Sequence, residues 1–123
     1  MAANPGAPTE IRLRRKSRLL ELRYADGARF ELPFEYLRVY SPSAEVRGHG
    51  AGEGKLELAK EQVQVSEVEP IGNYAVRLVF DDGHNTGLYS WAYLYELGAG
   101  YPEKWARYLE RCERLGYERR PAG

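Results

Sequence analysis

The fold is decided by residues 20–32, which read LELRYADGARFEL. Apolar side chains alternate with charged ones on both sides of the pair Asp26-Gly27. Alternation with a period of two is typical of strands with one buried face, and an Asp-Gly pair between two such runs is the strongest short-range signal of a β-hairpin. We therefore expect two antiparallel strands whose inner face carries Leu20, Leu22, Tyr24, Phe30 and Leu32.

The segments next to this hairpin extend it. Residues 10–16 alternate in the same way, with Ile11 and Leu13 on one side and basic residues on the other, which predicts a half-buried strand. Pro33 ends the hairpin's second strand, and residues 34–40 fit one short helical turn.

A second hairpin is expected further along the chain. Residues 74–80 alternate between two turn signals, Gly72-Asn73 and Asp82-Gly83. The strand before them is expected around residues 63–71, and the strand after them around residues 87–89.

The C-terminal part of the chain predicts helices. Ser90 is a good N-cap for a helix over residues 91–97, which Gly98 ends. Pro102 suits the first turn of a last helix, and Gly116 suits its end. The spacing i, i+3, i+4, i+7 predicts that one face of this last helix is buried and carries Trp105, Tyr108, Leu109, Cys112 and Leu115.

Strands first and helices last predict an α+β domain. We expect a small antiparallel β-sheet domain with two β-hairpins, a short helix and a C-terminal amphipathic helix. Residues 1–9 are predicted as a disordered leader, residues 10–117 as one domain and residues 118–123 as a flexible tail.

Composition excludes several classes of function. The chain of 123 residues has 18 basic and 18 acidic side chains, so no net charge draws it to nucleic acid or to a membrane surface. Its one cysteine, Cys112, cannot form an internal disulfide, and no apolar run is long enough to span a membrane. We expect a cytoplasmic protein that binds neither nucleic acid nor membrane.

Motifs for catalysis are missing from the sequence. The glycine-rich loop at residues 48–55 has His49 and Leu56 where a phosphate-binding P-loop needs Gly and Ser or Thr. Neither histidine begins the H-x-D or H-x-E pair of a non-haem iron oxygenase, and the sequence contains no H-E-x-x-H or G-x-S-x-G motif. The basic residues of 12–18 fit the solvated face of an edge strand better than an anion site. We therefore expect no enzyme activity, no catalytic residues and no cofactor.

Two stretches carry a resemblance to a known family. They are LRVYSPSAEVRGH at residues 37–49 and the segment 73–97, which contains D-G-H-x-x-G-x-Y-x-W from Asp82 to Trp91. Together they resemble the γ-butyrobetaine hydroxylase-like N-terminal domain, also known as DUF971. In hydroxylases of that family the domain precedes an iron- and 2-oxoglutarate-dependent oxygenase domain, and it binds zinc through three cysteines and one histidine.

The resemblance implies that this chain is of the stand-alone bacterial type, without the oxygenase domain, and has a degenerate zinc site. The four ligand positions correspond to Ser41, Ser43, Val46 and His84, of which His84 alone is a good zinc ligand. If the fold is kept, His84 should still lie close to the loop at residues 41–46, joined to it by hydrogen bonds and packing instead of metal.

Two functions follow as expectations. The first is a non-enzymatic accessory or protein-interaction domain, with an unknown protein partner or a second copy of itself. The alternative is a module that handles a small ligand or a metal cofactor, because related domains are attached to scaffold proteins for iron–sulfur clusters. The candidate interaction or ligand surface consists of Glu45, Arg47, His49, Tyr89, Trp91 and Tyr93, and the alternative also uses His84.

Overall fold

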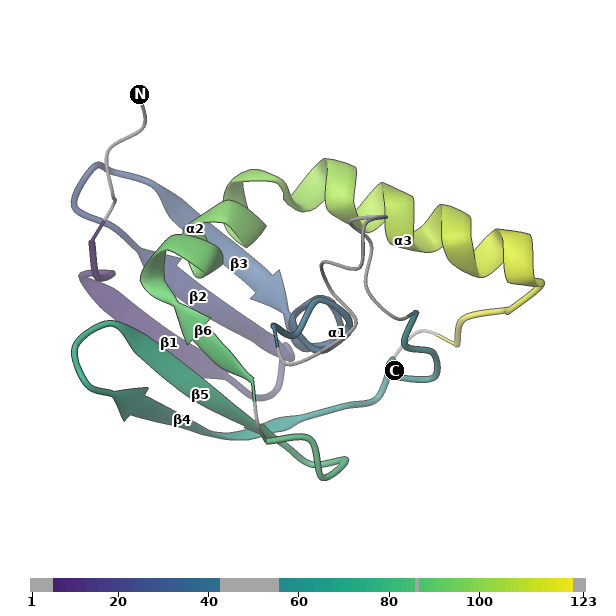
Figure 1. Cartoon of the computed structure of the whole chain (residues 1–123), viewed down its shortest axis with the longest axis horizontal. Helices are drawn as coiled ribbons and strands as arrows, with labels where there is room; N and C mark the ends of the chain where they lie inside the picture. The colour runs from purple at the N-terminus through teal and green to yellow at the C-terminus, as the bar shows by residue number, and fades with distance from the viewer. Residues whose placement is uncertain (1–5, 43–55, 86, 121–123) are drawn as a thin grey trace.

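The computed structural model describes residues 6–42, 56–85 and 87–120. Two antiparallel three-stranded sheets lie against each other, and the helices cover one end and one side of the pair (Figure 1). The first sheet consists of β1 (Glu10–Arg14), β2 (Leu19–Arg23) and β3 (Arg29–Pro33). The second sheet consists of β4 (Val65–Ile71), β5 (Ala75–Phe80) and β6 (Leu88–Ser90). The helices are α1 (Phe34–Val39), α2 (Trp91–Ala99) and α3 (Tyr101–Leu115).

The predicted α+β class and both predicted hairpins are confirmed. In the first hairpin the Tyr24 N–H donates to the Ala28 carbonyl at 2.9 Å, and the Ala28 N–H donates to the Asp26 carboxylate at 2.9 Å. Gly27 has a φ of 92°, a conformation that glycine adopts without strain. The Asp-Gly pair therefore fixes the register of β2 against β3.

The core fills the space between the two sheets and α1. Its side chains come from β2 to β6 and from the first two helices, and the most buried include Leu20, Leu22, Phe34, Leu37, Leu78, Tyr89, Leu94 and Leu97. Two buried tyrosines keep their hydroxyls satisfied, because Tyr36 donates to the Leu97 carbonyl and Tyr89 to the Leu37 carbonyl, both at 2.6 Å.

The second helix differs from the prediction at its end. Its N-cap is confirmed, because Ser90 Oγ accepts from the Tyr93 N–H at 3.1 Å. The helix runs through Gly98 to Ala99, however, and Gly100 is its C-cap. A Cβ at position 98 would overlap the ring of Phe30. Gly98 therefore allows the helix to approach β3 closely, and the prediction that it ends the helix was wrong.

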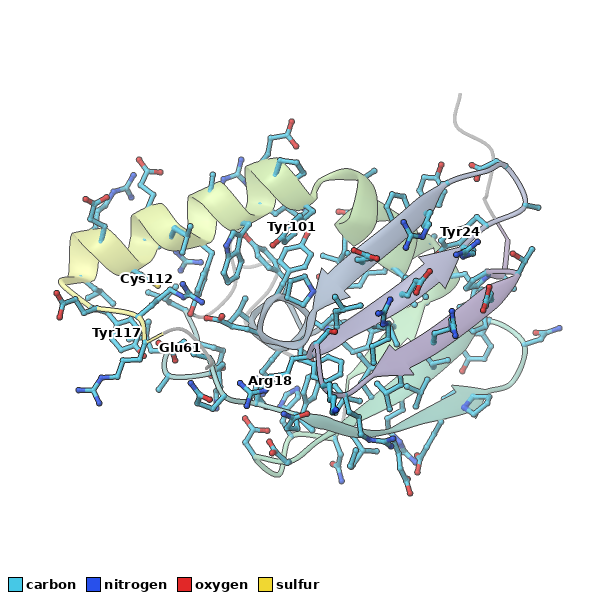
Figure 2. All side chains as sticks on the ribbon, turned by 180° about the vertical axis from the view of Figure 1, so that it is seen from behind. Arg18, Tyr24, Glu61, Tyr101, Cys112 and Tyr117 are labelled. Atoms are coloured by element: carbon cyan, nitrogen blue, oxygen red, sulfur yellow. The ribbon has the colours of Figure 1, made fainter. Side chains whose placement is uncertain are left out.

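The last helix is buried along a narrower face than predicted. Tyr108 and Cys112 are buried and Trp105 is half-buried, but Leu109 is 37% exposed and Leu115 is 62% exposed. In Figures 1 and 2 this helix extends beyond the sheets, and its buried residues Tyr108 and Cys112 pack with the end of α1, with Leu56 and Leu58 and with Tyr117. The expectation that Leu109 and Leu115 are buried was therefore wrong. Gly116 ends the helix with a φ of 78°, as predicted.

Residues beyond this helix contact the domain. The Tyr117 hydroxyl donates to Glu61 at 2.6 Å (both residues are labelled in Figure 2), and the Arg120 N–H donates to the same carboxylate at 2.9 Å. Arg119 pairs with Glu35 of α1 and lies over the ring of Trp105. Within the described residues, no helix is both long and apolar enough to cross a membrane.

Candidate functional site

The histidine of the D-G-H string lies against the loop that follows α1. His84 Nε2 and Ser41 Oγ are 2.8 Å apart, and Ser41 is 2% exposed. The short helix α1 ends just before Ser41, and the turn between β5 and β6 presents His84 to it. The prediction that His84 stays close to this loop is confirmed at Ser41. Ser43 and Val46 lie outside the described residues.

Asp82 organises the turn that carries His84. Its Oδ1 accepts from the His84 N–H at 3.2 Å, and its Oδ2 accepts from Arg38 Nε at 2.9 Å and from Lys60 Nζ at 2.8 Å. Burial alone raises the pKa of Asp82, but these hydrogen bonds and the charge of Arg38 outweigh it and lower the pKa to about 2. The aspartate is therefore ionised at neutral pH and ties the turn to α1 and to Lys60.

The imidazole itself is kept neutral. Burial lowers the pKa of His84 below its ordinary value, and the Arg38 cation lowers it further. A neutral imidazole has one nitrogen that donates and one that accepts. The ring can therefore share a hydrogen bond with the Ser41 hydroxyl without burying an extra charge.

Gly87 leaves the space into which the Ser41 hydroxyl fits. A Cβ at position 87 would lie 2.5 Å from Ser41 Oγ and 3.2 Å from the ring of Tyr89. The glycine of the D-G-H-x-x-G string is therefore explained by packing, because any larger residue would push the two segments apart. We call the contact of Ser41, His84, Gly87 and Tyr89 the serine–histidine tie.

The tie does not fit the zinc ion that the resemblance implies. A tetrahedral zinc site needs four ligands of the thiolate, imidazole or carboxylate type. Here the hydroxyl and the imidazole bond directly to each other, which leaves no space for an ion between them. The described parts of the chain contain no group of three His, Cys, Asp or Glu residues able to hold a metal.

The predicted surface residues fall into three groups. Tyr89 is fully buried, so its assignment to an interaction surface was wrong. It alternates with exposed Leu88 along β6, and a short strand next to a helix does not reveal from sequence which side faces inward. Trp91 and Tyr93 are half-buried at the start of α2. Glu45, Arg47 and His49 lie outside the described residues.

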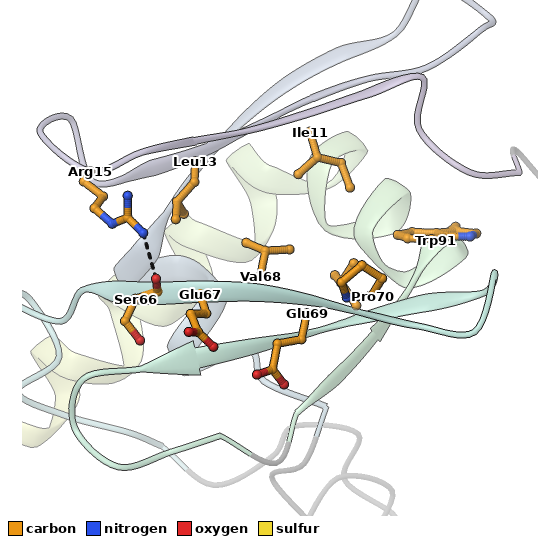
Figure 3. Close-up of a pocket in the computed structure, with 10 residues that line it drawn as sticks. Ile11, Leu13, Arg15, Ser66, Glu67, Val68, Glu69, Pro70 and Trp91 are labelled. Carbon is orange, nitrogen blue, oxygen red and sulfur yellow. Dashed lines mark hydrogen bonds between the residues drawn. The ribbon is translucent and has the colours of Figure 1, made fainter.

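A further hollow is one that the sequence did not single out. It is a groove of about 540 Å³ between β1 and β4, the neighbouring edge strands of the two sheets (Figure 3). We call it the edge groove. Ile11 and Leu13 project into it from β1 and Val68 from β4, as Figure 3 shows, and its lining also includes Arg15, Ser66, Glu67, Glu69, Pro70, Val76 and Trp91.

One end of the edge groove is closed by a single hydrogen bond. Arg15 Nη2 donates to the Ser66 carbonyl at 2.7 Å and so links the two sheets across the gap (Figure 3). The alternation of Ile11 and Leu13 predicts a half-buried strand. It does not indicate that, among the described residues, no element covers these two side chains from the side of β4.

The first strand is an edge strand, as the sequence suggested. Its basic residues pair within the sheet, and Arg14 lies 3.4 Å from Glu21. Glu21 was expected in solvent, but it is 1% exposed and accepts hydrogen bonds from Arg14, Arg23 and Arg29. The hydrogen bond from Arg29 is the main reason that the pKa of Glu21 is lowered.

Comparison with known proteins gives both a family and solved structures. The model of the family described as gamma-butyrobetaine hydroxylase-like, N-terminal, matches residues 11–95. Two NMR solution structures are 46% and 45% identical, cover 100% and 96% of this chain and 93% of each matched chain, and superpose with TM-scores of 0.83 and 0.80.

A crystal structure is also similar. It is a protein of unknown function of the DUF971 family from Acidithiobacillus ferrooxidans, solved at 1.93 Å resolution. It is 43% identical, covers 80% of this chain and 99% of its own, and has a TM-score of 0.66. No curated protein matches the chain.

Proposed function

Because this chain belongs to the γ-butyrobetaine hydroxylase-like N-terminal family, whose fold it has, we propose that it acts as a non-enzymatic accessory domain that binds another protein through the edge groove. The groove carries the proposal because it is an open, mainly apolar surface on a chain otherwise rich in charge. Concave and mainly apolar hollows with a few polar groups are where proteins preferentially bind other molecules.

The serine–histidine tie, whose side chains could in principle act in catalysis, is better explained by a structural role. The Ser41 hydroxyl is buried and bonded to His84, and Asp82 is engaged by two cations. A general base needs reach to a substrate proton. Neither side chain of the serine–histidine tie faces the edge groove, whose lining contains no serine–histidine pair.

A photo-crosslinking experiment in cells tests the proposal. A benzophenone amino acid is placed at Leu13 in the edge groove and, as a control, at Leu115, which is 62% exposed on α3. We expect a discrete protein adduct from position 13 and none of the same mass from position 115. If position 13 forms no adduct, or forms only those of position 115, the groove is not the binding surface and the proposal fails.

The metal-cofactor alternative is tested at the same time. Protein purified without a metal-affinity tag is expected to contain no stoichiometric zinc or iron, because a hydroxyl in the place of a thiolate weakens binding of both. Stoichiometric metal by elemental analysis would favour the alternative and would direct attention to the loop at residues 43–55.

A further inference from the structure

The edge groove differs from an ordinary apolar hollow because two strand edges form its rims. In an antiparallel ladder, alternate residues direct their N–H and C=O groups to the neighbouring strand and the others direct theirs away from it. The register of each sheet and the hydrogen bonds at the ends of its strands settle which residues do which, so the backbone groups that point to the groove side are known for both rims.

The first rim is β1, whose free groups belong to Ile11 and Leu13. Tyr24 pairs with Ala28, and the Phe34 N–H donates to the Arg18 carbonyl, so the even-numbered residues of β2 face β3. The odd-numbered residues of β2 then face β1, where their partners are residues 10, 12 and 14. Ile11 and Leu13 consequently direct their backbone groups away from β2, toward the free edge.

The second rim is β4, where Val68 and Pro70 occupy the corresponding positions. The Trp91 N–H donates to the Tyr74 carbonyl, so the even-numbered residues of β5 face β6 and the odd-numbered ones face β4. Their partners in β4 are residues 67, 69 and 71. Val68 and Pro70 therefore face the free edge, and Pro70, which has no N–H, loses nothing there.

The β4 rim already has an occupied carbonyl. Arg15 donates to the Ser66 carbonyl of β4 at one end of the groove, so a side chain of this chain uses an acceptor that a further strand would need on that rim. Within the described residues, no side chain or backbone group outside β1 is found to bond to Ile11 or Leu13. The side chains of the same two residues form the apolar wall of the groove (Figure 3).

The geometry points to one kind of occupant: an extended segment of a partner protein that adds to the free edge of β1 as a further strand. This inference rests on the proposed function and specifies it. The backbone of the segment pairs with Ile11 and Leu13, and every second side chain, apolar, enters the groove against Val68, Val76 and Trp91. We choose β1 over β4 because Pro70 removes a donor from the β4 edge.

The experiment uses a peptide that binds this protein. Random dodecapeptides displayed on phage are selected on the immobilised full chain, and the best sequence is synthesised. We expect it to alternate apolar and polar residues. Leu13→Asp should weaken its binding at least tenfold, and Leu109→Asp, a change of an exposed apolar residue on α3, should leave it unchanged.

Amide hydrogen exchange, followed by NMR on the unmodified protein, tests the strand itself. In the free protein the N–H groups of Ile11 and Leu13 should exchange fast, and those of Arg12 and Arg14 slowly, because only the latter face β2. Saturating peptide should slow exchange at Ile11 and Leu13 at least tenfold. Methylation of alternate peptide nitrogens should abolish binding in one register and spare it in the other.

Each outcome has one meaning. If a groove-dependent peptide binds but the amides of Ile11 and Leu13 stay fast, the groove binds protein and the added strand is wrong. If no peptide is selected, or if Leu13→Asp and Leu109→Asp bind equally, strand addition at the groove is wrong, and crosslinking at position 13 then decides whether the proposed function survives. If decanoate displaces the peptide and the bound peptide itself leaves the amides of Ile11 and Leu13 unprotected, the groove is a site for amphiphiles and the inference is overturned.

Discussion

The serine–histidine tie and the edge groove lie in the same small domain and handle exposure in opposite ways. The tie buries polar groups and satisfies them internally, so that Ser41 is 2% exposed and bonded to His84. The groove leaves the apolar side chains that line it half-exposed, although they adjoin the hydrophobic core. The difference teaches where the fold is stabilised and where it is left incomplete: changes at the tie should cost stability, and changes at the groove should cost binding.

The largest effect is expected at Tyr89, the fully buried aromatic residue of the tie. Tyr89→Ala removes a fully buried aromatic ring and its hydrogen bond to the Leu37 carbonyl, and should lower the free energy of unfolding by ~3–5 kcal/mol. Urea unfolding followed by circular dichroism measures it. Tyr89→Phe, the matched control, keeps the ring and should cost ~1–2 kcal/mol. A loss below ~1 kcal/mol for the alanine variant would contradict the burial of this ring.

The next largest effect is expected from a steric clash between the two segments that the tie joins. Gly87→Ala places a methyl group 2.5 Å from Ser41 Oγ, and overpacking of this kind should cost ~1–3 kcal/mol. Gly83→Ala is not a suitable control, because Gly83 has a φ of 90°. The double variant Gly87→Ala/Ser41→Ala removes the obstructing oxygen and should recover part of the loss. Equal stability of both variants would show that the clash is relieved elsewhere.

A smaller effect is expected at His84, together with a pH dependence. His84→Ala should destabilise the protein by ~1–2 kcal/mol at pH 7.5, because it deletes one buried hydrogen bond. The folded state lowers the pKa of His84 below its ordinary value of 6.5, so the unfolded chain binds the proton more readily. Stability is therefore complete above about pH 6.5 and falls as the pH drops below it.

The pH profile is the control for this prediction. Asp82, with a pKa of about 2, stays ionised through the same interval and loses its contribution only at much lower pH. The slope just below pH 6.5 should thus disappear in His84→Ala and persist in the wild type. A wild-type profile that is flat between pH 7 and pH 5 would contradict the neutral, buried imidazole.

The smallest effect is expected in the groove. Leu13→Ala removes a half-buried side chain from an open wall and should cost roughly 1 kcal/mol, about half of what full burial of a leucine provides. Leu20→Ala, at the fully buried position of β2 that pairs with Leu13, should cost ~2–5 kcal/mol. If both cost the same, the groove is part of the core and the contrast with the tie is lost.

How far the sequence could predict this molecule depends on the range of the interaction. Asp26-Gly27, Ser90 and Gly116 act within a few residues of themselves, so the hairpin, the N-cap and the helix end were predicted correctly. Gly98 was misinterpreted because its reason is Phe30, which lies 68 positions earlier in the chain. Leu109 and Leu115 have the spacing of a buried face, but the sheets end before they could cover them.

The candidate sites follow the same rule. The proximity of His84 and Ser41 could be predicted because both correspond to zinc-ligand positions in the family that the sequence resembles. The structure confirms this proximity. The buried Glu21 accepts from Arg23 of its own strand and from Arg14 and Arg29 of the two neighbouring strands, and alternation alone does not reveal these cross-strand neighbours. The edge groove depends on the absence of cover from a distant strand, for which a single sequence contains no signal.

Pro70 also decides what kind of assembly this molecule can avoid. Unpaired strand edges are a hazard, because identical copies can join edge to edge and grow into fibres. Growth across this side of the molecule would need two competent edges in each copy, one to receive a neighbour and one to offer to the next. The β4 edge has a proline at a position that faces outward, so it lacks one of the donors that a docked strand needs. A single imino acid thus makes β4 the poorer place for a further copy to dock, while the β1 edge beside it stays open for recognition.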